Sequence, residues 1–236
     1  MRRSVIVVIF SFLIGLTSCE KEKHELPGKI PGMGTAGGEL AIDQDFKMPE
    51  GVVIIGDITG LSPEMTGYTR RGSGEAVRLQ MTITNTTQKD TIIYFPKGLL
   101  LKSDRPDLYQ NGMLLQATWV DVAANSEMKV FLDSYCINLG IPGPDENATY
   151  TIPGTTGSEL MKELLETVSW SMINYEMVHN SQIYSCPLTY GEITDRLQNI
   201  VHNVTTRGID VTAEDKEFIV GIPELPEEYR PLTETN

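Results

Sequence analysis

The hydrophobic periodicity of this chain changes once, from a period of two to a period near that of an α-helix. Val77, Leu79, Met81 and Ile83 alternate with polar residues, which is typical of a strand with one buried face. Beyond residue 156, apolar residues recur three or four positions apart, which is typical of amphipathic helices. Strands followed by helices favour an α+β fold.

Residues 52–136 are predicted to form short antiparallel strands. Asn111-Gly112 is a strong turn signal, and polar residues over 85–89 predict another turn. We expect residues 91–95 to return from that turn as the hairpin partner of the strand over 77–84. Short strands at regular spacing predict a β-sandwich for this region.

Residues 137–222 are predicted to hold an irregular segment and then short helices. Thr156 with Glu159, and Thr189 with Glu192, have the spacing of capping boxes that start helices. A third short helix is expected over 212–220. Helices this short are not stable alone in water, so we expect them to pack on the strands.

The two flanks of this body are predicted to be irregular. Residues 19–51 are rich in glycine and proline and have little periodic apolar content, so we expect a flexible linker. The last residues, 223–236, are rich in proline and glutamate and are expected to form an acidic tail.

The first eighteen residues have the layout of a secretory signal peptide. Arg2 and Arg3 precede an apolar run over 5–16, which is shorter than the roughly 20 residues that span a bilayer. Small residues then lead directly to Cys19. We therefore expect residues 1–18 to be removed.

Leu16-Thr17-Ser18-Cys19 resembles the lipobox of bacterial lipoproteins. The resemblance implies that Cys19 is acylated, becomes the new N-terminus and attaches the chain to a membrane. Glu20 and the charged run after it are similar to the sorting signals of Bacteroides-type lipoproteins, which implies the outer membrane or cell surface. An ordinary signal peptide and a single membrane-spanning helix are the alternatives.

Charge and histidine content exclude several other functions. The net charge of −13 gives no basic footprint for nucleic acid. The three histidines are not paired at helix-face spacing and no Cys-x-x-Cys occurs, so we predict no metal site and no cofactor. Residues 68–72 form a basic, glycine-rich stretch that we interpret as a solvated loop. Carboxylates are too numerous for any pair to be nominated as catalytic.

Cys136 and Cys186 remain if Cys19 is acylated. The compartment beyond the inner membrane is oxidising, so a disulfide between these two cysteines is the first candidate. Two separate buried thiols are the second.

A third candidate comes from a resemblance. Tyr135-Cys136-Ile137 is similar to the aromatic-Cys-aliphatic motif of bacterial thioester adhesin domains, in which the cysteine bonds to a glutamine side chain and traps nucleophiles. The partner motif of those domains is matched in part by residues 197–202, where Gln198 would be the partner. His202 departs from that motif, and Gln198 falls within a predicted helix.

The sequence does not identify a ligand. We expect a lipid-anchored binding or structural module of the cell envelope, not an enzyme, with a glycan or protein as ligand. One alternative is a hydrolase whose site is assembled only in the fold. The other is a subunit of a surface or fimbria-like assembly.

Overall fold

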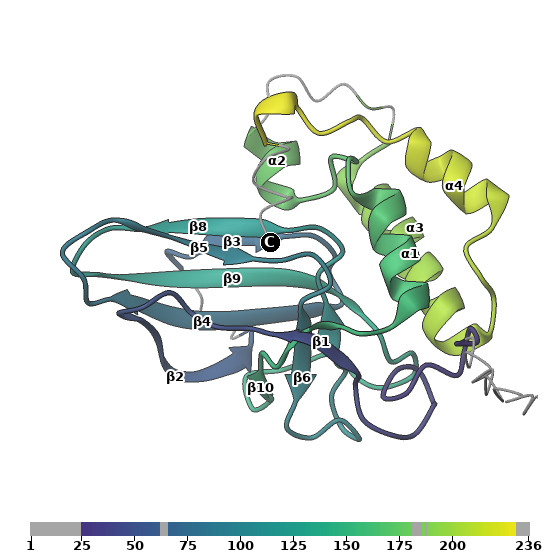
Figure 1. The fold of residues 1–236 in the computed structure, drawn as a ribbon, viewed down its shortest axis with the longest axis horizontal. Helices are drawn as coiled ribbons and strands as arrows, with labels where there is room; N and C mark the ends of the chain where they lie inside the picture. Colours follow the sequence, from purple (N-terminus) through teal and green to yellow (C-terminus); the bar gives the residue numbers. More distant parts are fainter. Residues whose placement is uncertain (1–24, 62–65, 181–185, 187, 230–236) are drawn as a thin grey trace, which may run out of the picture.

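The structure is a computed structural model that describes residues 25–61, 66–180, 186 and 188–229. Within these ranges the chain has an α+β fold in which the helices group at one side of the strands (Figure 1). The strands are β1 (Ile42–Asp45), β2 (Val52–Gly60), β3 (Thr69–Gly72), β4 (Val77–Asn85), β5 (Thr91–Phe95), β6 (Leu100–Ser103), β7 (Gly112–Met113), β8 (Thr118–Val122), β9 (Ser126–Cys136), β10 (Thr149–Thr151) and β11 (Gly154–Thr156). The helices are α1 (Glu159–Val168), α2 (Tyr175–Asn180), α3 (Tyr190–His202), a π-helical turn η1 (Asn203–Arg207), α4 (Ala213–Val220) and a 3-10 turn η2 (Glu227–Tyr229).

The main sheet is barrel-like. Its strands follow the order β9-β4-β2-β10-β6-β7, and β7 pairs again with β9. Strand β3 adds to β9 in parallel. The α+β prediction is confirmed, but the sandwich predicted for residues 52–136 is wrong, because these strands close on each other through β7. Alternating burial specifies which face of a strand is inside and does not distinguish a sandwich from a barrel.

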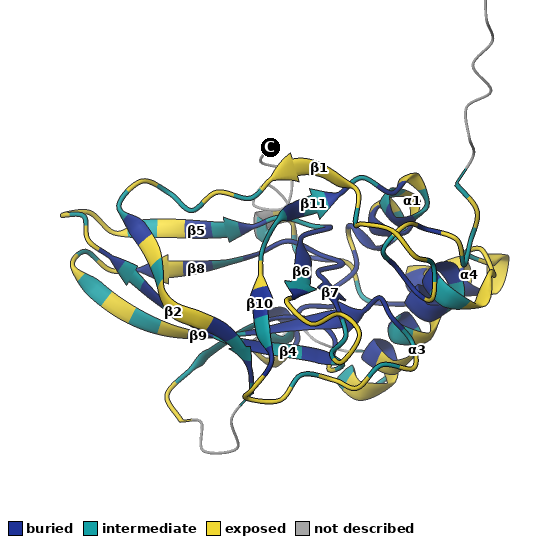
Figure 2. Cartoon of the chain, turned by 90° about the horizontal axis from the view of Figure 1, so that it is seen from below, coloured by how far each residue is buried: buried dark blue, intermediate teal, exposed yellow. Residues whose placement is uncertain are grey.

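Alternate residues of the long strands fill the interior of the barrel. Every second residue of β4 is buried, as its period of two predicts, and buried residues also alternate with more exposed ones along β8 (Figure 2). The barrel core includes Leu79, Ile83, Phe95, Leu132 and Cys136. Burial of these apolar faces is what stabilises the barrel.

The hairpin predicted between residues 77–84 and 91–95 does not form. Strand β4 pairs with β2 and β9, whereas β5 pairs with β8 in a separate two-stranded ribbon. Asn85, which is buried, donates from its side chain to the carbonyl of Lys89 at 2.8 Å and to that of Val122 at 3.0 Å. It therefore directs the chain after β4 towards β8 and away from a tight return.

The helices form a second core against β9. Buried residues of α1 and α3 cluster with Tyr135 and with two residues before β1, Ile30 and Met33. The capping box of Thr189 and Glu192 is confirmed at the start of α3. At α1 the predicted cap is wrong, because Ser158, not Thr156, accepts the amide hydrogen bond from Met161. The third helix forms as α4, capped by Thr212.

The described part of the segment predicted as a linker, residues 25–51, packs on the body. Ile30 and Met33 are each 1% exposed, and the Gly34 N–H donates to the Ile137 carbonyl at 2.7 Å. Gly34 has a φ of 58°, and a Cβ there would lie 2.1 Å from the Thr205 carbonyl oxygen. Glycine at this position therefore permits close backbone contact instead of flexibility. The linker prediction is corrected for these residues.

The predicted tail is likewise ordered over residues 223–229. Leu225 is 1% exposed, Glu224 pairs with Ser171 in an isolated bridge, and Tyr229 stacks on Trp119. Its proline and glutamate content gave no signal of these long-range contacts. The rest of the predicted tail, residues 230–236, lies outside the described residues.

The packing of the N-terminal segment predicts a stability difference between two matched truncations. Ile30→Ala should lower the free energy of unfolding by roughly 2–5 kcal/mol, because it opens a cavity in the helical core. Leu26→Ala should change it by less than about 0.5 kcal/mol, because Leu26 is 55% exposed. Urea denaturation measures both variants. Equal and negligible effects would show that the segment is a free linker.

Candidate functional site

The C-terminal end of β9 brings a cysteine and a glutamine together. Strand β9 pairs with β4 only as far as Ser134 and with β3 only as far as Asp133. At Cys136 it pairs with β7, and the neighbouring Ile137 N–H donates to the Asn111 carbonyl there. Because backbone groups of successive residues point to opposite edges of a strand, the N–H and C=O of Cys136 face the other edge.

The side chain of Gln198, from α3, occupies that edge. Its Oε1 accepts from the Cys136 N–H at 2.9 Å, and its Nε2 donates to the Cys136 carbonyl at 2.8 Å. The carboxamide therefore satisfies both backbone groups, as a neighbouring strand would. These two bonds also assign the orientation of the amide, because only the oxygen can accept and only the nitrogen can donate.

The Cys136 thiol is buried and neutral. Cys136 is 0% exposed, and burial raises its pKa to about 12. The Asn138 N–H donates to its Sγ at 3.2 Å, and the Asn138 side chain donates to the carbonyl of Gly34 at 3.2 Å. The thiol thus keeps its proton and is connected through Asn138 to the segment before β1.

His202 lies one helical turn after Gln198. Its Nε2 is 3.0 Å from Gln198 Nε2. Burial lowers the pKa of His202 to about 4, with a further contribution from the positive charge of Arg207. The imidazole is therefore neutral at physiological pH. Because Gln198 Nε2 can only donate, His202 Nε2 is the acceptor in this contact.

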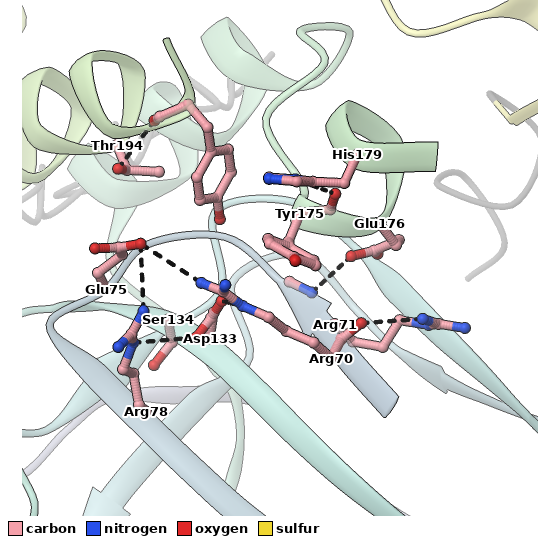
Figure 3. A network of polar contacts seen from close by, with 12 residues as sticks. Arg70, Arg71, Glu75, Arg78, Asp133, Ser134, Tyr175, Glu176, His179 and Thr194 are labelled. Carbon is pink, nitrogen blue, oxygen red and sulfur yellow. Dashed lines mark hydrogen bonds and ion pairs between the residues drawn. The ribbon is translucent and has the colours of Figure 1, made fainter. Parts of the chain in front are cut away.

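A buried polar network lies on the helix-facing side of β9 (Figure 3). Asp133 is 0% exposed and accepts from Arg70 Nε at 2.6 Å, while Arg78 Nε lies 3.6 Å away. Burial raises the pKa of Asp133 to about 6, although both arginines act to lower it. The Arg70 guanidinium also stacks on the ring of Tyr175, 3.8 Å from its centroid.

Glu176 joins α2 to the strands in the same network (Figure 3). Its carboxylate accepts from the Gly72 N–H at 3.0 Å and from the Thr118 hydroxyl. Burial raises the pKa of Glu176 to about 7, opposed by these hydrogen bonds and by the charge of Arg71. Both carboxylates are held by fixed partners, so the network positions α2 against β3 and β8.

A separate groove of about 810 Å³ lies between β1, β5 and α1. Phe46, Ile92 and Tyr94 supply its apolar walls, and the ion pair of Lys97 and Glu166 lies at its margin. The groove shares no residue with the Cys136–Gln198 contact. The charges that line it are of both signs, which gives it no preference for an ionic ligand.

Of the predicted site residues, the structure describes Cys136, Cys186 and Gln198. Cys19 lies outside the described residues. Cys136 and Cys186 are both free thiols, so the predicted disulfide is not formed, and they pack against different cores. Gln198, the partner that the thioester resemblance implies for Cys136, contacts the backbone N–H and C=O of that residue, and the thioester itself stays a prediction.

The buried polar network has no counterpart among the sequence predictions. The prediction of a solvated loop over 68–72 is wrong, because most of this stretch forms β3 and its Arg70 binds Asp133. Asp133 alternates with Leu132 along the strand and so falls on the face opposite the predicted core, which gave no sign of its burial. Glu176 gave no sign either, because α2 has only six residues.

The described residues hold no group of three or more histidine, cysteine or acidic side chains placed to bind a metal ion. Among the helices of the described ranges, none is both long and apolar enough to cross a membrane.

Comparisons of this chain with protein-family models, with curated proteins and with solved structures gave no significant match.

The burial of Glu176 predicts a pH-dependent effect of Glu176→Gln. The folded-state pKa is raised above that of the unfolded chain, so the folded protein holds the proton and loses stability as pH rises towards 7. The variant lacks this loss. Relative to the unsubstituted chain, it should gain roughly 3 kcal/mol in the free energy of unfolding between about pH 4 and pH 8.

The matched control is Glu217→Gln, which alters an exposed carboxylate. Its difference from the unsubstituted chain should stay nearly constant over the same pH range. Denaturant titrations at several pH values measure both differences. A flat difference for Glu176→Gln would show that Glu176 is ionised throughout in the folded protein.

Proposed function

We propose that this chain is a lipid-anchored binding module of the bacterial cell envelope that captures its partner covalently through an internal thioester. The anchor is acylated Cys19, exposed at the outer membrane or cell surface. The thioester joins Cys136 Sγ to the Gln198 side chain. The observation that carries the proposal is the pair of hydrogen bonds that holds the Gln198 carboxamide on the backbone N–H and C=O of Cys136.

The proposed bond forms by loss of ammonia. The Cys136 sulfur attacks Cδ of Gln198, the C–N bond breaks, and the amide nitrogen leaves with the thiol proton as ammonia. In the folded chain the Gln198 carboxamide is already hydrogen-bonded to the Cys136 backbone, which lowers the entropic cost of bringing the thiol and the carboxamide together. The neutral state of the thiol supplies the proton that the leaving nitrogen needs.

Capture of the partner is the second step. A primary amine on a protein or glycan attacks the thioester carbonyl, the C–S bond breaks, and Cys136 regains its proton as a thiol. The amine ends in an amide bond with the Gln198 side chain. No oxidant or cofactor is needed. Covalent capture suits a surface module, because the bond persists when the envelope is sheared or diluted.

The resemblance to thioester adhesin domains supports this function from the sequence. Residues 135–137 match the cysteine motif of those domains, and the contact between Cys136 and Gln198 gives the partial match at 197–202 a spatial meaning. A hydrolase and an assembly subunit, the other classes considered, have no comparable pairing of reactive groups among the described residues.

The anchor predicts a change in membrane association. Cys19→Ser should move the protein from the detergent phase to the aqueous phase in a detergent partitioning experiment and should block removal of residues 1–18, because the acylated residue is absent. Cys186→Ser is the control and should partition as the unsubstituted chain does. Unchanged partitioning and processing of Cys19→Ser would contradict lipid anchoring.

The thioester predicts a defined mass. The purified chain should weigh one ammonia less than its processed sequence, and methylamine should convert it to a species heavier than that sequence by one CH₂ group. Cys136→Ser and Gln198→Glu should have the full mass and should not react. Cys186→Ser should behave as the unsubstituted chain.

A denatured chain of full mass with two thiols that react with iodoacetamide would contradict the thioester. A mass lower by two hydrogens, lost in Cys186→Ser, would show a disulfide of Cys136 with Cys186 instead.

A further inference from the structure

We propose that His202 Nε2 is the proton acceptor for the amine that attacks the thioester, and that it lies where this amine enters. The inference rests on the proposed thioester of Cys136 and Gln198. It assigns to His202 a role that the thioester adhesin motif, which has a hydrophobic residue at this place, does not supply.

The leaving group, the Gln198 amide nitrogen, lies beside the imidazole. The hydrogen bonds with the Cys136 backbone place Gln198 Nε2 next to His202 Nε2, at 3.0 Å. Ammonia therefore departs from a site that borders this ring nitrogen. Attack by an amine is the reverse of ammonia loss with a substituted nitrogen, so the incoming amine occupies the same site by microscopic reversibility.

The His202 ring is neutral at physiological pH. His202 is 9% exposed, and its pKa is lowered by burial and by Arg207, which follows it in η1. Arg207 also donates to the Asn203 side chain at 2.9 Å, which holds that charge close to the end of α3. The ring nitrogen that faces Gln198 is consequently free to accept a proton.

The proton of the attacking amine passes through His202 to the Cys136 sulfur. As the amine nitrogen bonds to the Gln198 carbonyl carbon, its proton passes to His202 Nε2 and the C–S bond electrons return to Cys136 Sγ. The thiolate, whose conjugate acid has a raised pKa, then takes the proton from the imidazolium. The imidazole is restored, and the products are an amide and a thiol.

The geometry also limits the class of substrate. Gln198 is half-buried and Cys136 is fully buried, so the acyl carbon is reached from the side of α3. An unprotonated primary amine on a slender chain, such as a lysine side chain of a partner protein, fits this approach. The neutral imidazole would also favour such an amine over a charged ammonium, which has no lone pair to attack.

The test measures methylamine incorporation into the purified chain by mass spectrometry. His202→Ala should react on the order of 100-fold more slowly, the usual effect of losing a general base. Added imidazole should restore a large part of the rate, because the substitution leaves space for it beside Gln198. His179→Ala, which alters an exposed histidine on α2, should react at the unsubstituted rate.

The outcomes of this test distinguish the role of His202 from the existence of the thioester. A thioester that forms in the unsubstituted chain and reacts equally fast in His202→Ala would overturn the role of His202 and leave the proposed function standing. A slow His202→Ala that imidazole does not accelerate would also overturn the proton-acceptor role. A full-mass unsubstituted chain would refute the proposed function itself. His202→Gln, compared by thermal melting, shows whether loss of folding accounts for a slow rate.

Discussion

The backbone at the end of β9 must be hydrogen-bonded without a neighbouring strand, and the rest of the site depends on this constraint. Cys136 is buried, so its free N–H and C=O would each cost about 1–3 kcal/mol if left unpaired. The Gln198 carboxamide meets both requirements from α3. This contact therefore fixes the position of α3 along the strand, and with it the helical core around Tyr135 and Leu197.

The buried polar network secures the same interface a few residues earlier on β9. Asp133 of β9 accepts a hydrogen bond from Arg70, and the Arg70 guanidinium stacks on Tyr175 of α2 (Figure 3). Buried charges of this kind add little to stability, but they penalise any other arrangement because a lost partner leaves a charge uncompensated. The network and the Gln198 contact thus specify one placement of the helices on the barrel.

Periodicity predicted the elements of this fold better than their partners. The alternation of β4 and the capping box at Thr189 are local patterns, and the structure has the corresponding strand and helix. Barrel closure depends on the two residues of β7, and the burial of Ile30 and Leu225 depends on surfaces far away in sequence. Composition wrongly indicated irregular chain at both flanks. In the N-terminal flank Gly34 permits close backbone contact, and in the proline- and glutamate-rich C-terminal flank Leu225 is buried. Of the site, Cys136 and Gln198 could be nominated from motifs, while Glu176 could not.

A purely structural interpretation of the Gln198 contact explains less than the site contains. The contact uses only backbone groups of residue 136, so Gln198 could form the same two hydrogen bonds with a serine, alanine or valine there. The structural role requires neither a thiol at residue 136 nor an imidazole 3.0 Å from the carboxamide nitrogen. Under the proposed function the Cys136 thiol, the Gln198 acyl group and the neutral base His202 are supplied by β9 and by successive turns of α3. Acyl transfer uses all three groups, whereas helix docking uses one.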